Sequence, residues 1–124
     1  MSVWLLVGVG GALGSMARFG LSGLVHRYLG MSFPYGTFTV NIFGCLVFGA
    51  IASAGDGRFG IGPSGRALVL TGVIGGFTTF SAFSFETFAL LRDGKPGLAA
   101  INVGGQVAVG LVAIWIGYTI PRAL

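Results

Sequence analysis

The chain has 124 residues, of which 54% are hydrophobic and only 8% are charged. An ordinary soluble domain has about 25% charged residues, so this composition excludes water as the main solvent and predicts an integral membrane protein. The formal net charge of +4 comes from seven dispersed basic residues that form no basic stripe, which argues against a nucleic-acid binder.

Four apolar segments are long enough to cross a bilayer, which takes about 20 residues in a helix. We expect these helices over residues 3–28, 35–54, 67–91 and 97–120. The linkers are short and polar or rich in Gly and Pro, so consecutive helices should run antiparallel within a single domain, residues 1–124. Pro121 is expected to stop the last helix. The first segment has no basic start and no clear small-residue cleavage site, so we expect it to be retained rather than removed as a signal peptide.

Small residues recur four positions apart on two of these helices. Gly10 and Gly14 share one face of the first helix, and Gly72 and Gly76 share one face of the third. Such pairs let helix backbones approach closely in lipid, so we expect both to be helix contact faces. The single cysteine, Cys45, lies in an apolar run and is expected to be a small core residue.

The basic residues give almost no orientation signal. With four spans, one membrane side would hold Arg58, Arg66 and Arg122, and the other Arg18, Arg27, Arg92 and Lys95. Because Lys and Arg in short loops favour the cytoplasm, this near-equal count predicts a chain that can insert in either direction. Two opposed copies can pair about a two-fold axis in the membrane plane, so we predict an antiparallel, dual-topology homodimer. The alternative is that another factor fixes one orientation.

The titratable residues do not suggest an enzyme. The acids are Asp56, Glu86 and Asp93, and the one histidine is His26. Neither a metal-ligand cluster nor a nucleophile with its base can be assembled from them, so we predict no catalytic activity and no catalytic residues.

Two polar residues inside the spans are functional candidates, because polar groups in lipid are costly. Arg18 lies about 15 residues into the first helix, near the far side of the hydrocarbon core. It can extend to the headgroups or attract anions into a vestibule. Asn41 lies in the second helix with Thr37 on the same face. Its amide can make an interhelical hydrogen bond or donate to an anion in a pore.

The stretch 75–84 predicts a break in the third helix near mid-membrane. It begins with Gly75 and Gly76 and continues with Thr and Ser, which compete with helical backbone hydrogen bonds. Non-helical backbone at this depth must be enclosed by protein or line a watery cavity, and such breaks often form ion sites. The alternative is a smooth helix that is kinked at glycine.

Two phenylalanines follow the predicted break on one helix face, Phe80 and Phe83. The edge of an aromatic ring carries partial positive charge and can stabilise a small dehydrated anion without binding it too tightly. Phenylalanines on one helix face more often pack against neighbours than line a pore. The reason to consider a pore role here is that these two directly follow the predicted break.

Three motifs occur in order on the first three helices: GGALGSMAR at 10–18, GTFTVNIFG at 36–44 and GGFTTFSAF at 75–83. They resemble the GGxxGxxxR, GTxxxNxxG and GGFTTFSxF motifs of the Fluc/CrcB family of fluoride channels. Three ordered motifs make the resemblance specific over nearly the whole chain. The fourth helix, with Asn102, Gln106 and Thr119, fits the family pattern least.

The resemblance implies a fluoride-selective channel that exports fluoride passively from the cytoplasm and lowers its toxicity. It implies a multi-pass protein of a bacterial inner or plasma membrane that forms a dual-topology homodimer with two fluoride pathways. A structural sodium ion would lie at the dimer centre, held by the backbone carbonyls of Gly75 and Thr78 from each chain. The implied fluoride pathway consists of Phe80 and Phe83 as ring-edge ligands, Asn41 as amide donor, Ser81 and Thr79 as hydroxyls, and Arg18 as vestibule cation.

Two other functions stay open from the sequence. A proton-coupled exporter resembling the small multidrug resistance family also has four short spans, but it needs a membrane-embedded carboxylate on the first helix. This first helix has none, and Glu86 lies near the end of the third. A purely structural membrane subunit would leave the break and Asn41 without a role.

Overall fold

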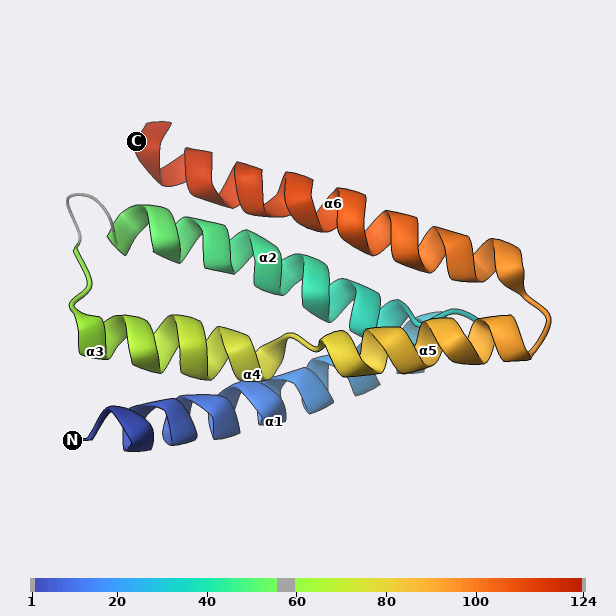
Figure 1. The fold of residues 1–124 in the computed structure, drawn as a ribbon, viewed down its shortest axis with the longest axis horizontal. Helices are drawn as coiled ribbons and strands as arrows, with labels where there is room; N and C mark the ends of the chain where they lie inside the picture. Colours follow the sequence, from blue (N-terminus) through green and yellow to red (C-terminus); the bar gives the residue numbers. More distant parts are fainter. Residues whose placement is uncertain (1, 56–59, 124) are drawn as a thin grey trace.

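The computed structural model describes residues 2–55 and 60–123, and its regular elements there are all helices. Figure 1 shows their arrangement. The elements are α1 (Val3–Leu29), α2 (Tyr35–Gly55), α3 (Pro63–Arg66), η1 (Ala67–Ile74), α4 (Gly75–Phe77), α5 (Phe80–Arg92) and α6 (Pro96–Ala123). Asp56 and Arg58 lie outside the described residues.

Four stretches are long and apolar enough to cross a membrane, which confirms the predicted number of spans. They are Val3–Leu29, Tyr35–Ala54, Pro63–Arg92 and Pro96–Ala123, and the third combines α3, η1, α4 and α5. The start of α1, the end of α2, the start of α3 and the end of α6 lie at one end of the bundle, and the turn between α5 and α6 lies at the other (Figure 1). Consecutive spans therefore run antiparallel, as the short linkers predicted.

The third and fourth spans are longer than expected. The third begins at Pro63 rather than at residue 67, because Pro63 occupies the first helical position, where a missing N–H costs nothing. The prediction that Pro121 stops the last helix was wrong, since α6 continues to Ala123 with Pro121 inside its final turn. Proline has a helical φ and removes only one backbone hydrogen bond, so the chain keeps its helical path there.

The spans pack in pairs through glycines. The first half of the third span, η1 and α4, lies against α1. The second half, α5, lies against α6, and α2 packs mainly on α6. A Cβ added at Gly10 would lie 3.0 Å from Gly72 Cα, and one added at Gly76 would lie 2.6 Å from the Gly11 carbonyl oxygen. The predicted contact faces are thus confirmed, because only glycine permits this approach.

Candidate functional site at the broken third span

The third span is interrupted in its middle, which confirms the predicted break. Thr78 has φ −84° and ψ 156°, and Thr79 has φ −149° and ψ 118°, so both are extended between α4 and α5. Gly75 and Gly76 are helical, so the break lies at the two threonines rather than at the glycine pair. Their hydroxyls bond to the two helix ends: Thr78 Oγ1 donates to the Ile74 carbonyl at 3.0 Å, beside the backbone bond from Thr78 N, and Thr79 Oγ1 caps α5 by accepting from Ala82 N at 3.2 Å.

At the break, two backbone amides donate to side-chain oxygens instead of to the carbonyls that they would reach in a continuous helix. In a continuous helix the N–H of Thr79 would donate to Gly75, and that of Ala82 to Thr78. Here Thr79 N donates to Asn41 Oδ1 at 2.9 Å, and Ala82 N donates to the Thr79 hydroxyl. Gly75 is exposed on the protomer surface and Thr78 lines a groove there. The Gly75 and Thr78 carbonyls, which the family resemblance implies as cation ligands, therefore both lack the amide donor that a continuous helix would give them.

A third carbonyl at the break is capped from α1. The Gly76 oxygen accepts from Arg18 Nε at 3.1 Å and from Ser15 Oγ at 3.5 Å. A guanidinium at the C-terminal end of η1 and α4 also complements the partial negative charge of that helix end. Arg18 therefore lies beside the break, and α1 fastens the first half of the third span.

Asn41 of α2 hydrogen bonds to the backbone of Thr79, at the α5 side of the break. Its Oδ1 accepts from Thr79 N, and its Nδ2 donates to the Thr79 carbonyl at 3.1 Å and to Gln106 Oε1 at 2.8 Å. The side chain thus pairs with both backbone groups of one extended residue. Both amide hydrogens have protein acceptors, so an anion that takes one of them must compete with Thr79 or Gln106.

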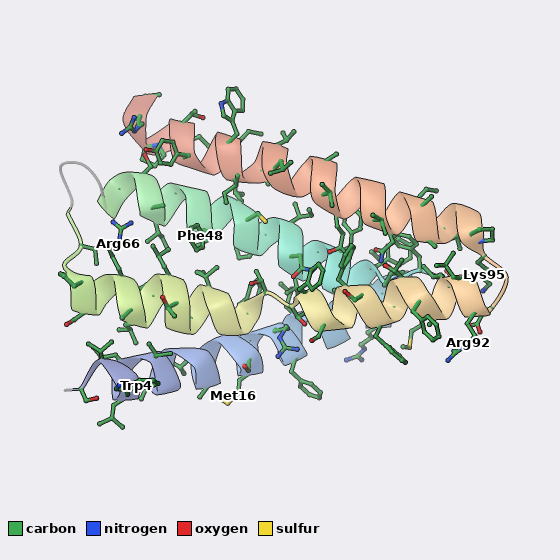
Figure 2. The ribbon with its side chains drawn as sticks, viewed as in Figure 1. Trp4, Met16, Phe48, Arg66, Arg92 and Lys95 are labelled. Atoms are coloured by element: carbon green, nitrogen blue, oxygen red, sulfur yellow. The ribbon has the colours of Figure 1, made fainter. Side chains whose placement is uncertain are left out.

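A groove of about 360 Å³ opens beside the break, and its exposed lining is mostly apolar. It brings together five of the residues singled out from the sequence, which are Asn41, Thr78, Thr79, Phe80 and Phe83. Phe48 of α2 also lines it, and Figure 2 shows this ring on the side of α2 that faces the third span. Cys45, expected in the core, is only half-buried because it lines this groove.

The two phenylalanine rings contact each other, with centroids 5.6 Å apart and planes tilted by 43°. Phe80 is 78% exposed in the protomer. The Ser81 hydroxyl lies 3.4 Å from that of Thr79, so it extends the polar edge of the break. Arg18, Gly75 and Ser81 are not part of the groove lining, although all three lie at or next to the break.

Sequence reasoning missed three polar residues around the site. Gln106 and Asn102 of α6 are 8% and 0% exposed and hydrogen bond to each other at 2.9 Å. Their spacing of four on one helix face was the available signal. Glu86 of α5 accepts a hydrogen bond from Thr37 Oγ1 at 2.8 Å through Oε1, while its buried Oε2 has no partner among the described residues. The Thr37 hydroxyl therefore donates to the Glu86 carboxyl group and not to Asn41.

The fold and the site together define a class of protein. It is a multi-pass membrane protein whose third span is broken beside a groove lined by aromatic rings and side-chain amides. The family described as CrcB-like protein, Camphor Resistance (CrcB) matches residues 5–118. This chain belongs to that family.

Three curated relatives are named "Fluoride-specific ion channel FluC". The protein of Methylobacillus flagellatus is 53% identical over 119 residues, which cover 95% of this chain and 93% of the relative. That of Opitutus terrae is 51% identical over 95% of this chain and 91% of its own. That of Maridesulfovibrio salexigens is 41% identical over 100% of this chain and 98% of its own. The similarity therefore covers the whole bundle, break included.

Proposed function

We propose that this chain is a fluoride-selective channel that lets fluoride leave the cytoplasm passively and so lowers its toxicity. The observation that carries the proposal is the identity of about half with relatives named as fluoride channels, over more than nine-tenths of both chains. The broken span, the two rings and the amide groove give that similarity a physical basis.

The fluoride pathway runs along the groove beside the break. Phe80 and Phe83 present ring edges, whose partial positive charge replaces part of the ion's hydration without binding it too strongly. Asn41, Thr79 and Ser81 add amide and hydroxyl donors beside the rings. Arg18 adds positive charge near the break and draws the anion toward it.

The working unit is an antiparallel dual-topology homodimer in a bacterial inner or plasma membrane. The high exposure of the Phe80 ring and of Gly75 at mid-span supports this, because a second protomer would cover both. The near-equal basic count on the two sides supports insertion in both directions. An axis in the membrane plane brings the two mid-span breaks together, and each dimer then carries two pathways.

A sodium ion at the dimer centre holds the two breaks together. The carbonyls of Gly75 and Thr78 suit it, since both have their helical amide donors diverted and carbonyl oxygens are ligands for hard cations. Among residues 2–55 and 60–123 no three His, Cys, Asp or Glu side chains cluster, so backbone oxygens are the appropriate donors there. The ion supplies positive charge that offsets four buried carbonyls, two from each chain.

Fluoride release from liposomes tests the function. Purified protein is reconstituted with internal potassium fluoride or potassium chloride, valinomycin is added, and the anion is followed with an ion-selective electrode. We expect rapid fluoride release and chloride release no faster than from protein-free liposomes. Transport that depends on a pH gradient and on an organic cation would instead indicate a proton-coupled exporter. Glu86 would then be the candidate carboxylate. No release of either anion would indicate a structural subunit.

A further inference from the structure

One chain of hydrogen bonds leaves the break at Thr79 and returns to the same half of the span at Phe83. It crosses from α5 to α2, from α2 to α6, and from α6 back to α5. Its five bonds run from Thr79 N to Asn41 Oδ1 (2.9 Å), Asn41 Nδ2 to Gln106 Oε1 (2.8 Å), Gln106 Nε2 to Asn102 Oδ1 (2.9 Å), Asn102 Nδ2 to Thr87 Oγ1 (2.9 Å) and Thr87 Oγ1 to the Phe83 carbonyl (2.8 Å).

The direction of this chain is set by its two ends. The Phe83 carbonyl can only accept, so the Thr87 hydroxyl donates to it and is left to accept from Asn102. The Thr79 N–H can only donate, so Asn41 must present its oxygen there. Each amide between them therefore has one permitted orientation. Rotating Asn41 by half a turn would bring two donors together at Thr79 N and two acceptors together at Gln106 Oε1.

The middle of the chain is the part sealed from solvent and lipid. Asn102 is 0% exposed, and Gln106, which lines the groove together with Asn41, is 8% exposed. Hydrogen bonds in such surroundings polarise one another, and an unmatched polar group there is costly. Gln106 links the Asn41 amide to the fully buried Asn102 of α6.

We propose that Gln106 is a positioning residue of the fluoride pathway. By accepting from Asn41 Nδ2 it ties to α6 a carboxamide that already holds both backbone groups of Thr79, which helps to keep the Thr79 N–H engaged and away from the Gly75 carbonyl. The break then stays extended, and α5 begins at Phe80 with both rings at the groove. This role rests on the proposed function and names the residue that sets the geometry of that same site.

Two substitutions separate positioning from packing. Gln106→Leu keeps the approximate size and removes the acceptor, so Asn41 keeps its two bonds to Thr79 but loses the one that holds it to α6. Gln106→Glu keeps the shape, and its effect depends on protonation. A neutral carboxyl group accepts from Asn41 and donates to Asn102 as the amide does, whereas a carboxylate presents an acceptor to Asn102 Oδ1. Thr119→Val is the matched control, because that α6 hydroxyl donates to Ile116 of its own helix.

The experiment measures fluoride release from liposomes carrying the full-length protein at about pH 5.5 and about pH 8, each divided by the wild-type rate at that pH. The lower pH favours the neutral form of the introduced carboxyl group, and the higher pH favours the carboxylate. Cys45 lining the same groove, Glu86 on α5 and Arg18 beside Gly76 are the same in every variant, so the comparison with wild type at each pH isolates the change at position 106.

We expect Gln106→Leu to release fluoride at least about tenfold more slowly at both pH values. Gln106→Glu should be equally slow at the higher pH and recover toward wild type at the lower, and Thr119→Val should match wild type. If wild type releases fluoride and Gln106→Leu releases it equally fast, the positioning role alone is overturned. The same holds if the Gln106→Glu ratio does not change with pH. A wild-type protein that releases no fluoride would overturn the proposed function and this role with it.

Discussion

Gly14→Ala should separate α1 from the first half of the third span. A Cβ at this position would meet the Val73 carbonyl oxygen and lie 2.8 Å from Phe77 N, both of them backbone atoms that cannot rotate away. Gly8→Ala is the matched control, because a Cβ there has no atom within 4 Å. The two substitutions add the same methyl group to the same helix, at a contact face and at an open position.

The cost follows from how far α1 must move. Ordinary van der Waals contact begins at 3.4 Å, so α1 must retreat by about 0.6 Å from Phe77 N alone. One turn further along α1, Arg18 Nε is 3.1 Å from the Gly76 carbonyl, and the same retreat would stretch this hydrogen bond beyond its normal range. Overpacking costs about 1–3 kcal/mol and a lost bond to a charged group about 1.5–3 kcal/mol. Alanine returns about 1 kcal/mol through helix propensity, which leaves a net loss of about 1.5–5 kcal/mol.

Equilibrium unfolding in mixed detergent micelles with increasing sodium dodecyl sulfate, followed by circular dichroism, measures this difference. Gly14→Ala should unfold at a clearly lower denaturant fraction than wild type, and Gly8→Ala should match wild type or exceed it slightly. Fluoride release by Gly14→Ala should also fall, since Arg18 no longer fastens the break. Equal stability of the two variants would refute the close approach of α1 to η1 and α4.

Three further predictions follow from the site. Phe80→Ile should leave a well-behaved dimer by size-exclusion chromatography with fluoride release at least tenfold slower (about 1.4 kcal/mol of barrier), because the role of the ring is electrostatic; wild-type release would show that the ring edge is not a ligand. Replacing sodium by a large organic cation throughout purification and assay should weaken the dimer or its flux, and complete removal without effect would exclude a central cation. A cysteine at Lys95, in the exposed turn after α5, should react with an impermeant maleimide from both membrane sides, about half of the copies from each, whereas labelling from one side alone would contradict dual topology. Lys95 lies with Arg92 at the end of the bundle away from both termini, so the label reports one face (Figure 2).

The sequence determined the membrane class, the four spans and the presence of a break. These features depend on local composition, because about 20 apolar residues span a bilayer in any tertiary context and adjacent hydroxyl residues compete with helical bonds wherever they lie. The glycine faces of α1 and the third span were also readable, since a spacing of four repeats on one side of any helix.

The tertiary structure decided where the break falls and what holds it. Gly75 and Gly76 stay helical, with Gly76 packed against Gly11 of α1, and the chain opens at Thr78 and Thr79, where Asn41 hydrogen bonds to the Thr79 backbone. Asn41 was visible as an intramembrane amide, but its partner Gln106 lies 65 residues further along the chain. A hydrogen bond across that separation depends on how α2, α5 and α6 pack, and helical periodicity reports only which residues share a face of their own helix.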